Sequence, residues 1–238
     1  FIPIFQYLRM APKTICEALP TACNGDTTLT WVSLESGEIY GPLPTELAAL
    51  PNLEFLDLGG NTLSGTLPSE FSGLHKMLRA NISGNAISGT LPSEWSALPS
   101  LQWMELSANR IEGHLPTPWA RAPYLRTLIL DNNQISGHLP SGEFTVDGNF
   151  RILKLVKNLL SGTLPTIYSP KWTELYLGNN YFWGTVPTTW GDPNWALQVL
   201  GLNDNHVLSG TLPTQLGRLT SLSSLWLGNH AADLFSTT

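Results

Sequence analysis

Asn61-Thr-Leu-Ser-Gly65-Thr-Leu-Pro68 is the stretch that decides the fold, because relatives of its last five residues return along most of the chain. They are YGPLP at 40–44, SGTLP at 64–68, 88–92, 161–165 and 209–213, EGHLP at 112–116, SGHLP at 136–140 and WGTVP at 183–187. Self-similarity at a fixed period indicates stacked units, each too small to bury a core alone. We therefore expect one elongated repeat domain.

Each unit follows the pattern L-x-x-L-x-L-x-x-N-x-L-S-G-x-L-P, with copies beginning at Leu29, Leu53, Met77, Leu101, Leu125, Phe150, Trp172, Leu197 and Leu222. The alternation at the start of each copy predicts a short strand with leucines inward and the intervening residues outward. Stacked strands form a parallel sheet. The sequence thus predicts an α/β repeat, a right-handed leucine-rich repeat solenoid with a parallel β-sheet on its concave face. The concave face is the outward side of that sheet.

The two ends of the chain depart from the repeat. Residues 1 to 28 are expected to form an N-terminal cap over the otherwise exposed core, starting with a helix over the first ten residues. Residues 29 to 227 hold about eight to nine copies of ~24 residues. Residues 228 to 238 are expected to be the C-terminal end or a truncated cap.

The two cysteines, Cys16 and Cys23, both lie in the cap. A pair seven residues apart in a loop can close a small ring, so the sequence predicts a disulfide that stabilises the cap. The alternative is two free, buried thiols. We favour the disulfide because this repeat type points to the outside of the cell, where disulfides persist.

Composition excludes several classes of protein. The 42% of apolar residues argue against disorder, and a net charge of −6 argues against a nucleic-acid partner. No apolar run reaches the ~18 to 20 residues that span a bilayer. The chain begins at Phe1, from which we infer a processed or trimmed N-terminus and expect any membrane anchor to lie outside this sequence.

Several recurring residues are interpreted as structural. The column of asparagines at position nine is expected to hydrogen-bond backbone groups where the chain leaves the strand. The glycine and proline of the signature are expected to shape the backbone, and the x-Leu pair between them to form a second short strand on one flank. Trp95, Trp119 and Trp190 share a register that predicts core anchors on the convex side.

The concave face carries the candidate binding residues. The N-terminal part combines Trp31, Phe55 and Trp103 with acidic Asp57 and Glu105. The middle gathers Arg126, Arg151, Lys154 and Lys157, followed by Tyr176. Exposed aromatic residues beside charges are typical anchors of a protein or glycan interface. The alternative is scattered surface tryptophan in a tryptophan-rich protein.

Other candidate chemistry is weaker. His114 and His138 occupy the same position in adjacent copies, but no third ligand is evident, so we expect neither a metal nor a cofactor. Threonines fill the other copies of that column, which suggests ice binding, although the two histidines and Pro42 interrupt it. No enzyme motif is present. Asn81-Ile-Ser83 is an N-glycosylation sequon on the concave face, and the sequence leaves open whether it is used.

The repeat resembles the plant-type extracellular leucine-rich repeat of plant receptor ectodomains and polygalacturonase-inhibiting proteins, over about residues 29 to 227. Cys16-Glu-Ala-Leu-Pro-Thr-Ala-Cys23 keeps the cysteine spacing of that family's cap. Leu-Pro-Ser-Glu-Trp95-Ser-Ala-Leu looks most like the surface antigens of Leishmania and related kinetoplastids. Either resemblance implies a secreted or cell-surface protein, often lipid-anchored, that binds other molecules and is not an enzyme.

We therefore expect an extracellular or cell-surface recognition module, a monomer, that binds a protein or glycan on its concave face. A structural surface-coat protein is the first alternative, in which no concave substitution should matter. An inhibitor of cell-wall-degrading enzymes is the second.

Overall fold

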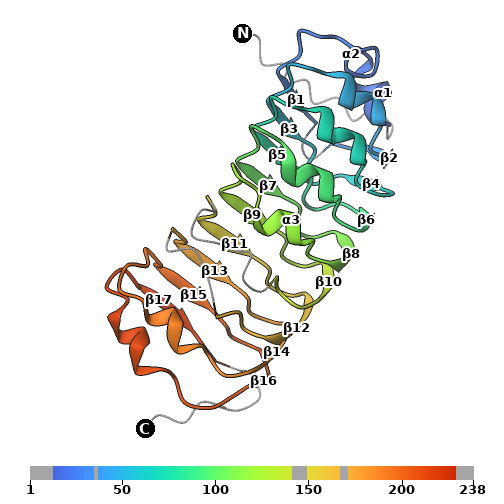
Figure 1. Ribbon diagram of the computed structural model, residues 1–238. Coiled ribbons are helices and arrows are strands. Elements are labelled where there is room, and N and C mark those ends of the chain that lie inside the picture. Colours follow the sequence, from blue (N-terminus) through green and yellow to red (C-terminus); the bar gives the residue numbers. More distant parts are fainter. Residues whose placement is uncertain (1–12, 35–36, 141–148, 167–170, 229–238) are drawn as a thin grey trace.

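The computed structural model describes residues 13–34, 37–140, 149–166 and 171–228. Figure 1 shows one elongated stack of similar turns, with the two ends of the chain at opposite ends of the stack. The predicted repeat fold is confirmed. The helix expected within residues 1 to 12 and the C-terminal segment after residue 228 lie outside the described residues.

The main sheet follows the stack from end to end (Figure 1). Its nine parallel strands are hydrogen-bonded in the order in which they occur in the chain. In eight of the nine the central side chain is buried, and in most the two flanking ones are more exposed, as Phe55, Leu56 and Asp57 illustrate. In the last strand the central Leu225 is 39% exposed. The strands are β1 Trp31–Ser33, β3 Phe55–Asp57, β5 Arg79–Asn81, β7 Trp103–Glu105, β9 Thr127–Ile129, β11 Ile152–Lys154, β13 Glu174–Tyr176, β15 Val199–Gly201 and β17 Ser224–Trp226.

Equivalent residues of successive copies are direct neighbours in this sheet. Trp31 pairs with Phe55, Phe55 with Arg79, and Arg79 with Trp103. Adjacent parallel strands lie about 4.8 Å apart, so each outward column is a continuous row of side chains. The sequence columns are therefore columns in space.

An asparagine ladder runs beneath the end of the main sheet, as predicted. Each side-chain amide donates to carbonyls of its own and the preceding copy, and its oxygen accepts an N–H from the preceding copy's flank. In Asn109, for example, Nδ2 donates to Ile82 and Leu106 carbonyls and Oδ1 accepts from the Ile87 N–H. The ladder satisfies backbone groups that the bend removes from the sheet. Its members are Asn61, Asn85, Asn109, Asn133, Asn158, Asn180 and Asn205.

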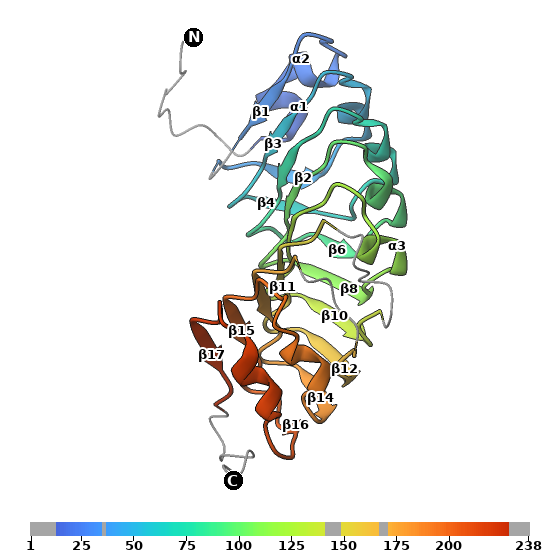
Figure 2. The same cartoon turned by 60° about the vertical axis from the view of Figure 1, so that its left-hand side comes forward.

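A second set of short parallel strands covers one flank (Figure 2). The sequence predicts that the x-Leu pair forms this strand, which is wrong for most copies: the strands lie mainly upstream, in the residues that follow the asparagine. Only three of them reach the x residue, at Pro42, His114 and Thr163. The reason is that the asparagine oxygen fixes this backbone, whereas the Leu of the pair turns into the core before a proline that has no N–H. The flank strands are β2 Tyr40–Pro42, β4 Thr62–Ser64, β6 Ser88–Gly89, β8 Arg110–His114, β10 Gln134–Gly137, β12 Leu159–Thr163, β14 Tyr181–Gly184 and β16 Val207–Leu208.

Two separate features of the structure require the glycine of the signature. Its φ lies in the left-handed region in every copy, for example +78° at Gly113 and +79° at Gly137. A Cβ at Gly137 would also lie 2.2 Å from Nδ1 of His114, because each x side chain lies over the glycine of the next copy. The signature therefore recurs because the copies must stack closely on one another.

Short helices follow the signature proline and pack on the opposite side of the core (Figure 2). Trp95, Trp119 and Trp190 are fully buried there, and each indole donates to a carbonyl of a proline about one copy upstream. The prediction that they are core anchors is confirmed. The helices are η1 Thr45–Ala49, η2 Ser69–Gly73, η3 Ser93–Ala97, α3 Thr117–Ala120, η4 Thr188–Gly191 and η5 Thr214–Arg218.

The described part of the N-terminal cap contains α1 (Ile15–Ala18) and α2 (Pro20–Cys23). Thr14 and Glu17 form a reciprocal capping box at the start of α1. Cys16 and Cys23 form the predicted disulfide. Ile15 is buried and belongs to the same hydrophobic core as the first repeats, so the cap continues that core.

Candidate functional site

The N-terminal half of the concave face carries a row of four side chains, which we call the N-terminal cluster: Trp31, Phe55, Arg79 and Trp103. The rings of Trp31 and Phe55 stack with centroids 4.9 Å apart. The Arg79 guanidinium lies 5.5 Å from the ring centre of Trp103, at cation–π distance. Trp31 remains 60% exposed. These contacts hold the rings in place while leaving part of their surface to solvent.

Acidic residues border this cluster in the next column. Asp57 accepts hydrogen bonds from the Gly59 N–H and from the Asn81 amide, and Glu105 accepts one from the Ser107 N–H. Each carboxylate is half-buried and held by the backbone near its own strand. The predicted combination of aromatic and acidic side chains is therefore present as one surface.

The C-terminal cluster consists of Lys154, Glu174, Tyr176 and Trp226. The Lys154 ammonium lies 3.4 Å from a Glu174 carboxylate oxygen and 4.6 Å from the Tyr176 ring centre. Tyr176 and Trp226 approach to 5.5 Å across Gly201, whose missing side chain makes room for both rings. Burial, with the neighbouring Glu174 carboxylate, raises the pKa of the Tyr176 hydroxyl above its ordinary value. This hydroxyl stays protonated and able to donate.

Arg126 and Arg151 lie between the two clusters. They occupy adjacent copies of one column, and the Arg151 N–H donates to the Arg126 carbonyl. Both side chains are exposed, and neither forms an ion pair within the part of the chain that the structure describes. Lys157, also exposed, follows β11. The face thus presents two free guanidinium groups between aromatic surfaces.

Asp131 is a half-buried carboxyl at the end of the concave face, and its Oδ1 accepts the Val156 N–H at 2.6 Å. Burial raises the pKa of Asp131 from 3.8 to about 6, opposed by that hydrogen bond and reinforced by Glu105. Because the folded pKa is the higher one, the carboxyl favours folding below pH 3.8, and this contribution is lost as the pH rises through about 6.

Asp131→Asn is therefore expected to stabilise the protein at pH 7.5 by about 1 to 2 kcal/mol, a value reduced for partial exposure. The advantage should shrink toward zero near pH 4, and urea denaturation at both pH values measures it. Asp26→Asn is the control of opposite sign, because hydrogen bonds from the Thr28 hydroxyl and N–H lower the pKa of Asp26. An advantage independent of pH would contradict this account.

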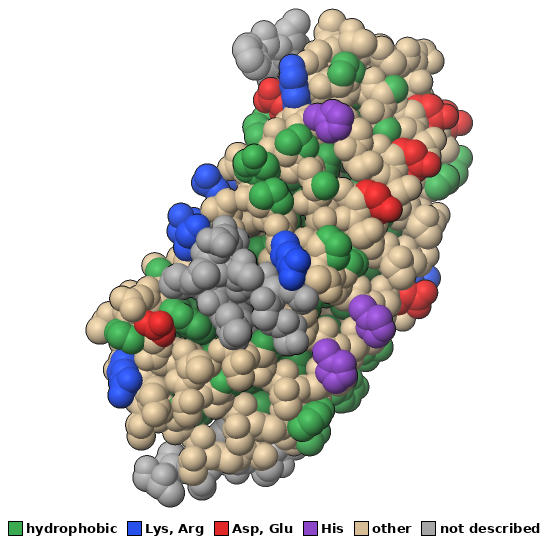
Figure 3. Space-filling view, viewed as in Figure 1, with side chains coloured by type: hydrophobic (Ala, Val, Ile, Leu, Met, Phe, Trp, Pro, Cys, Tyr) green, Lys and Arg blue, Asp and Glu red, His purple; other side chains and the backbone are tan. Residues whose placement is uncertain are grey.

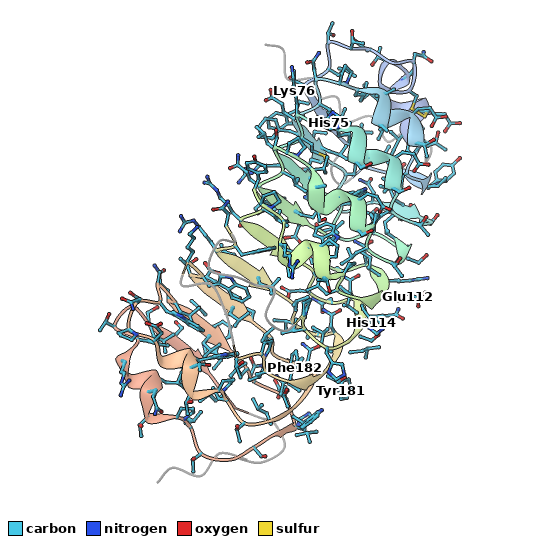
Figure 4. The ribbon with its side chains drawn as sticks, viewed as in Figure 1. His75, Lys76, Glu112, His114, Tyr181 and Phe182 are labelled. Atoms are coloured by element: carbon cyan, nitrogen blue, oxygen red, sulfur yellow. A yellow bond between two sulfur atoms is a disulfide. The ribbon has the colours of Figure 1, made fainter. Side chains whose placement is uncertain are left out.

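Two further candidates from the sequence are placed as follows. Asn81 lies on β5, where its amide donates to Asp57 and its oxygen accepts from Ser83, so its glycosylation stays a prediction. His114 lies on the flank, where its Nδ1 donates to the Ser136 carbonyl, 3.1 Å away. Figure 4 shows it beside Glu112. No group of three metal-binding side chains was found among the described residues.

Sequence reasoning left Arg79, Asp131 and Trp226 out of the candidate set. Their columns were visible, and Arg79 directly precedes Trp103 in one of them. A glycine between Tyr176 and Trp226 was the signal for their contact, since a missing side chain lets residues two strands apart meet. No within-copy pattern signalled the burial of Asp131.

Comparison with known proteins agrees with the repeat. Models of the leucine rich repeat match residues 51–111 and 124–143. A search of curated proteins gives no significant match. Each helix that the structure describes is too short or too polar to traverse a bilayer.

Several solved structures are similar. A plant ice-binding protein is 25% identical with a TM-score of 0.76, and the match covers 92% of this chain and 72% of that one. The ectodomain of the Arabidopsis receptor kinase HAESA, in complex with an N-terminally extended IDA peptide hormone, is 29% identical with a TM-score of 0.72, covering 89% and 35%. The plant peptide hormone receptor RGFR1, in complex with RGF2, is 24% identical with a TM-score of 0.73, covering 91% and 38%.

This chain therefore spans 35% and 38% of the two receptor chains. The structural neighbours include plant receptor ectodomains, in agreement with the plant-type resemblance. The finer resemblance to kinetoplastid surface antigens receives no support from these comparisons.

Proposed function

We propose that this leucine-rich repeat protein is a recognition module that binds a peptide or protein partner along its concave face. The observation that carries the proposal is the arrangement of that face. Two clusters of aromatic side chains, fixed by stacking and cation–π contacts, flank the exposed Arg126 and Arg151. Aromatic and arginine side chains are the residues most enriched among interface anchors.

The HAESA ectodomain, a structural neighbour, was solved with a peptide hormone, which supports a peptide partner here. The free guanidinium groups favour a partner with carboxylates between apolar side chains. The acidic border formed by Asp57 and Glu105 selects against acidic groups over the N-terminal cluster. We propose binding by a monomer, with no catalysis.

An extracellular or cell-surface location is part of the proposal. The Cys16–Cys23 disulfide supports it, because disulfides persist in oxidising compartments. The ectodomains among the structural neighbours support it as well.

Panning a random peptide display library against the protein tests the proposal. Selected peptides are expected to lose at least tenfold in affinity, about 1.4 kcal/mol or more, with Trp103→Ala and with Arg151→Glu. Titration calorimetry with the synthesised peptides measures this loss. Tyr40→Ala is the control, because Tyr40 is an exposed aromatic residue on the flank strand β2.

Three results would count against the concave face. Peptides that bind both variants as well as the parent would place the site elsewhere. An absence of selectable peptides would favour the structural coat protein. Inhibition of a pectinase that survives both substitutions would favour an inhibitor acting through another surface.

A further inference from the structure

The flank sheet carries an exposed apolar patch in its C-terminal half. It consists of Leu159 on β12, Tyr181 and Trp183 on β14 and Val207 on β16, which are 46%, 56%, 49% and 57% exposed. These three strands are hydrogen-bonded neighbours. Trp183 pairs with Val207, and Tyr181 lies two residues before Trp183 on the same outward side of β14, so these three side chains are neighbours. Leu159 lies on the adjacent strand β12. We call it the flank patch.

The solenoid does not need these side chains. The core side of the same strands is filled by Leu160, Phe182 and Leu208, each with no exposed surface. In earlier copies the position of Leu159 is held by the smaller or polar residues Thr62, Ala86, Arg110 and Gln134. The side chains of Tyr181 and Trp183 make no ring contact and no hydrogen bond with the described parts of the chain. Exposed apolar patches of this kind mark binding sites.

The strands that carry the flank patch are uncharged. Strands β10, β12, β14 and β16 contain no Lys, Arg, Asp or Glu, whereas β8 contains Arg110 and Glu112. Figure 3 shows acidic side chains along the upper right edge, with histidine and apolar side chains below them. Figure 4 places Tyr181 on this edge, beyond Glu112 and His114.

Serine and threonine hydroxyl groups lie around the rings of Tyr181 and Trp183. Ser161, Thr163, Thr185 and Ser209 lie on the same strands or at their ends, and none of their hydroxyls has a hydrogen-bond partner among the described residues. The methyl groups of Thr163 and Thr185 lie over Gly184 and Gly210 of the next copy. Their hydroxyls are therefore left for solvent or a ligand.

We propose that the flank patch binds a neutral polysaccharide, independently of the concave face. A pyranose ring has an apolar C–H face that stacks on aromatic rings and hydroxyls at its rim that pair with Ser and Thr. The absence of charge on these strands matches an uncharged polymer and disfavours an anionic one.

Other occupants fit less well. The exposed apolar area of four half-exposed side chains is on the order of 400 Å², half of the ~800 Å² per partner in a stable protein interface. A second copy of the chain is therefore disfavoured. An ice surface would need a regular array of outward methyl groups, but those of Thr163 and Thr185 face glycines, and Tyr181 and Trp183 project beside them.

Affinity electrophoresis through gels that contain mixed-linkage β-glucan, β-1,3-glucan, xylan or glucomannan tests the proposal, with polygalacturonate as the anionic comparison. At least one neutral polymer is expected to retard the parent protein. Trp183→Ala and Tyr181→Ala should each weaken that retardation at least tenfold. Tyr124→Ala, matched to Tyr181 in type and exposure, should not change it. Unchanged melting temperatures verify that the variants fold.

Four outcomes would overturn the proposal. They are no retardation by any neutral polymer, stronger retardation by polygalacturonate, equal retardation of all variants, and dimerisation or inhibition of ice recrystallisation that Trp183→Ala abolishes. The concave-face variants Trp103→Ala and Arg151→Glu should bind the polysaccharide like the parent, which separates this proposal from the peptide site.

Discussion

Asn158→Ala is expected to lower the free energy of unfolding by about 3 to 4 kcal/mol, the largest effect predicted for this protein. The Asn158 amide donates to the Leu130 and Leu155 carbonyls at 3.0 and 3.2 Å, and its oxygen accepts the Ile135 N–H at 3.0 Å. The side chain is only 4% exposed. Alanine would leave three backbone groups without partners where water has little access, and each such group costs about 1 to 3 kcal/mol.

Gln134→Ala is the matched control for this substitution. Gln134 carries a similar amide, is adjacent to Ile135 on β10, and points to solvent. Its removal should change stability by less than about 0.5 kcal/mol. Urea denaturation followed by circular dichroism measures both variants. Equal losses would mean that water replaces the buried amide and that the ladder is not the main link between copies.

Gly191→Ala is expected to destabilise the protein by about 2 to 3 kcal/mol, the cost of overpacking a close contact. A Cβ at Gly191 would lie 2.2 Å from the carbonyl carbon and oxygen of Gln215 in the next copy. The atoms that it meets are backbone, so two helices, η4 and η5, would have to separate. The φ of Gly191 is not in the left-handed region, so crowding alone causes the loss.

Gly217→Ala is the control, because Gly217 occupies the equivalent position one copy later with nothing within 4 Å of its added Cβ. This change should be neutral or stabilise by about 0.4 to 1 kcal/mol, since alanine restricts the unfolded chain. Thermal unfolding of the two variants separates crowding from the general effect of replacing glycine. A similar loss in both would contradict the proposed close approach.

Much of the fold was predictable because the same residue types recur at the same structural positions in successive copies. Alternation around Leu56 identified the strands, and the shared register identified Trp95 and its counterparts as core anchors. The candidate surface was predictable for the same reason. Residues such as Trp31, Phe55 and Trp103 occupy one outward position of successive strands, and stacking turns a shared position into a shared face.

Contacts between copies were less predictable. The flank strands begin upstream of the expected x-Leu pair, because the asparagine ladder and the proline decide where the backbone can pair. The stacking of Arg79 on Trp103 depends on side-chain directions across two strands. The raised pKa of Asp131 depends on its burial within the array and on groups of the copies before and after it, Glu105 and Val156.

The sequence by itself determined the period, the inward leucines and the asparagine ladder, because each follows from spacing within one or two copies. It also determined the disulfide partners, because the chain has only two cysteines. The tertiary structure alone decided which outward side chains touch, where Gly191 meets the next copy, and that Tyr181, Trp183 and Val207 form one patch. The physical reason is that spacing fixes the side of a strand on which a residue lies. The lateral offset between stacked copies fixes its neighbours, and that offset results from packing of the whole array.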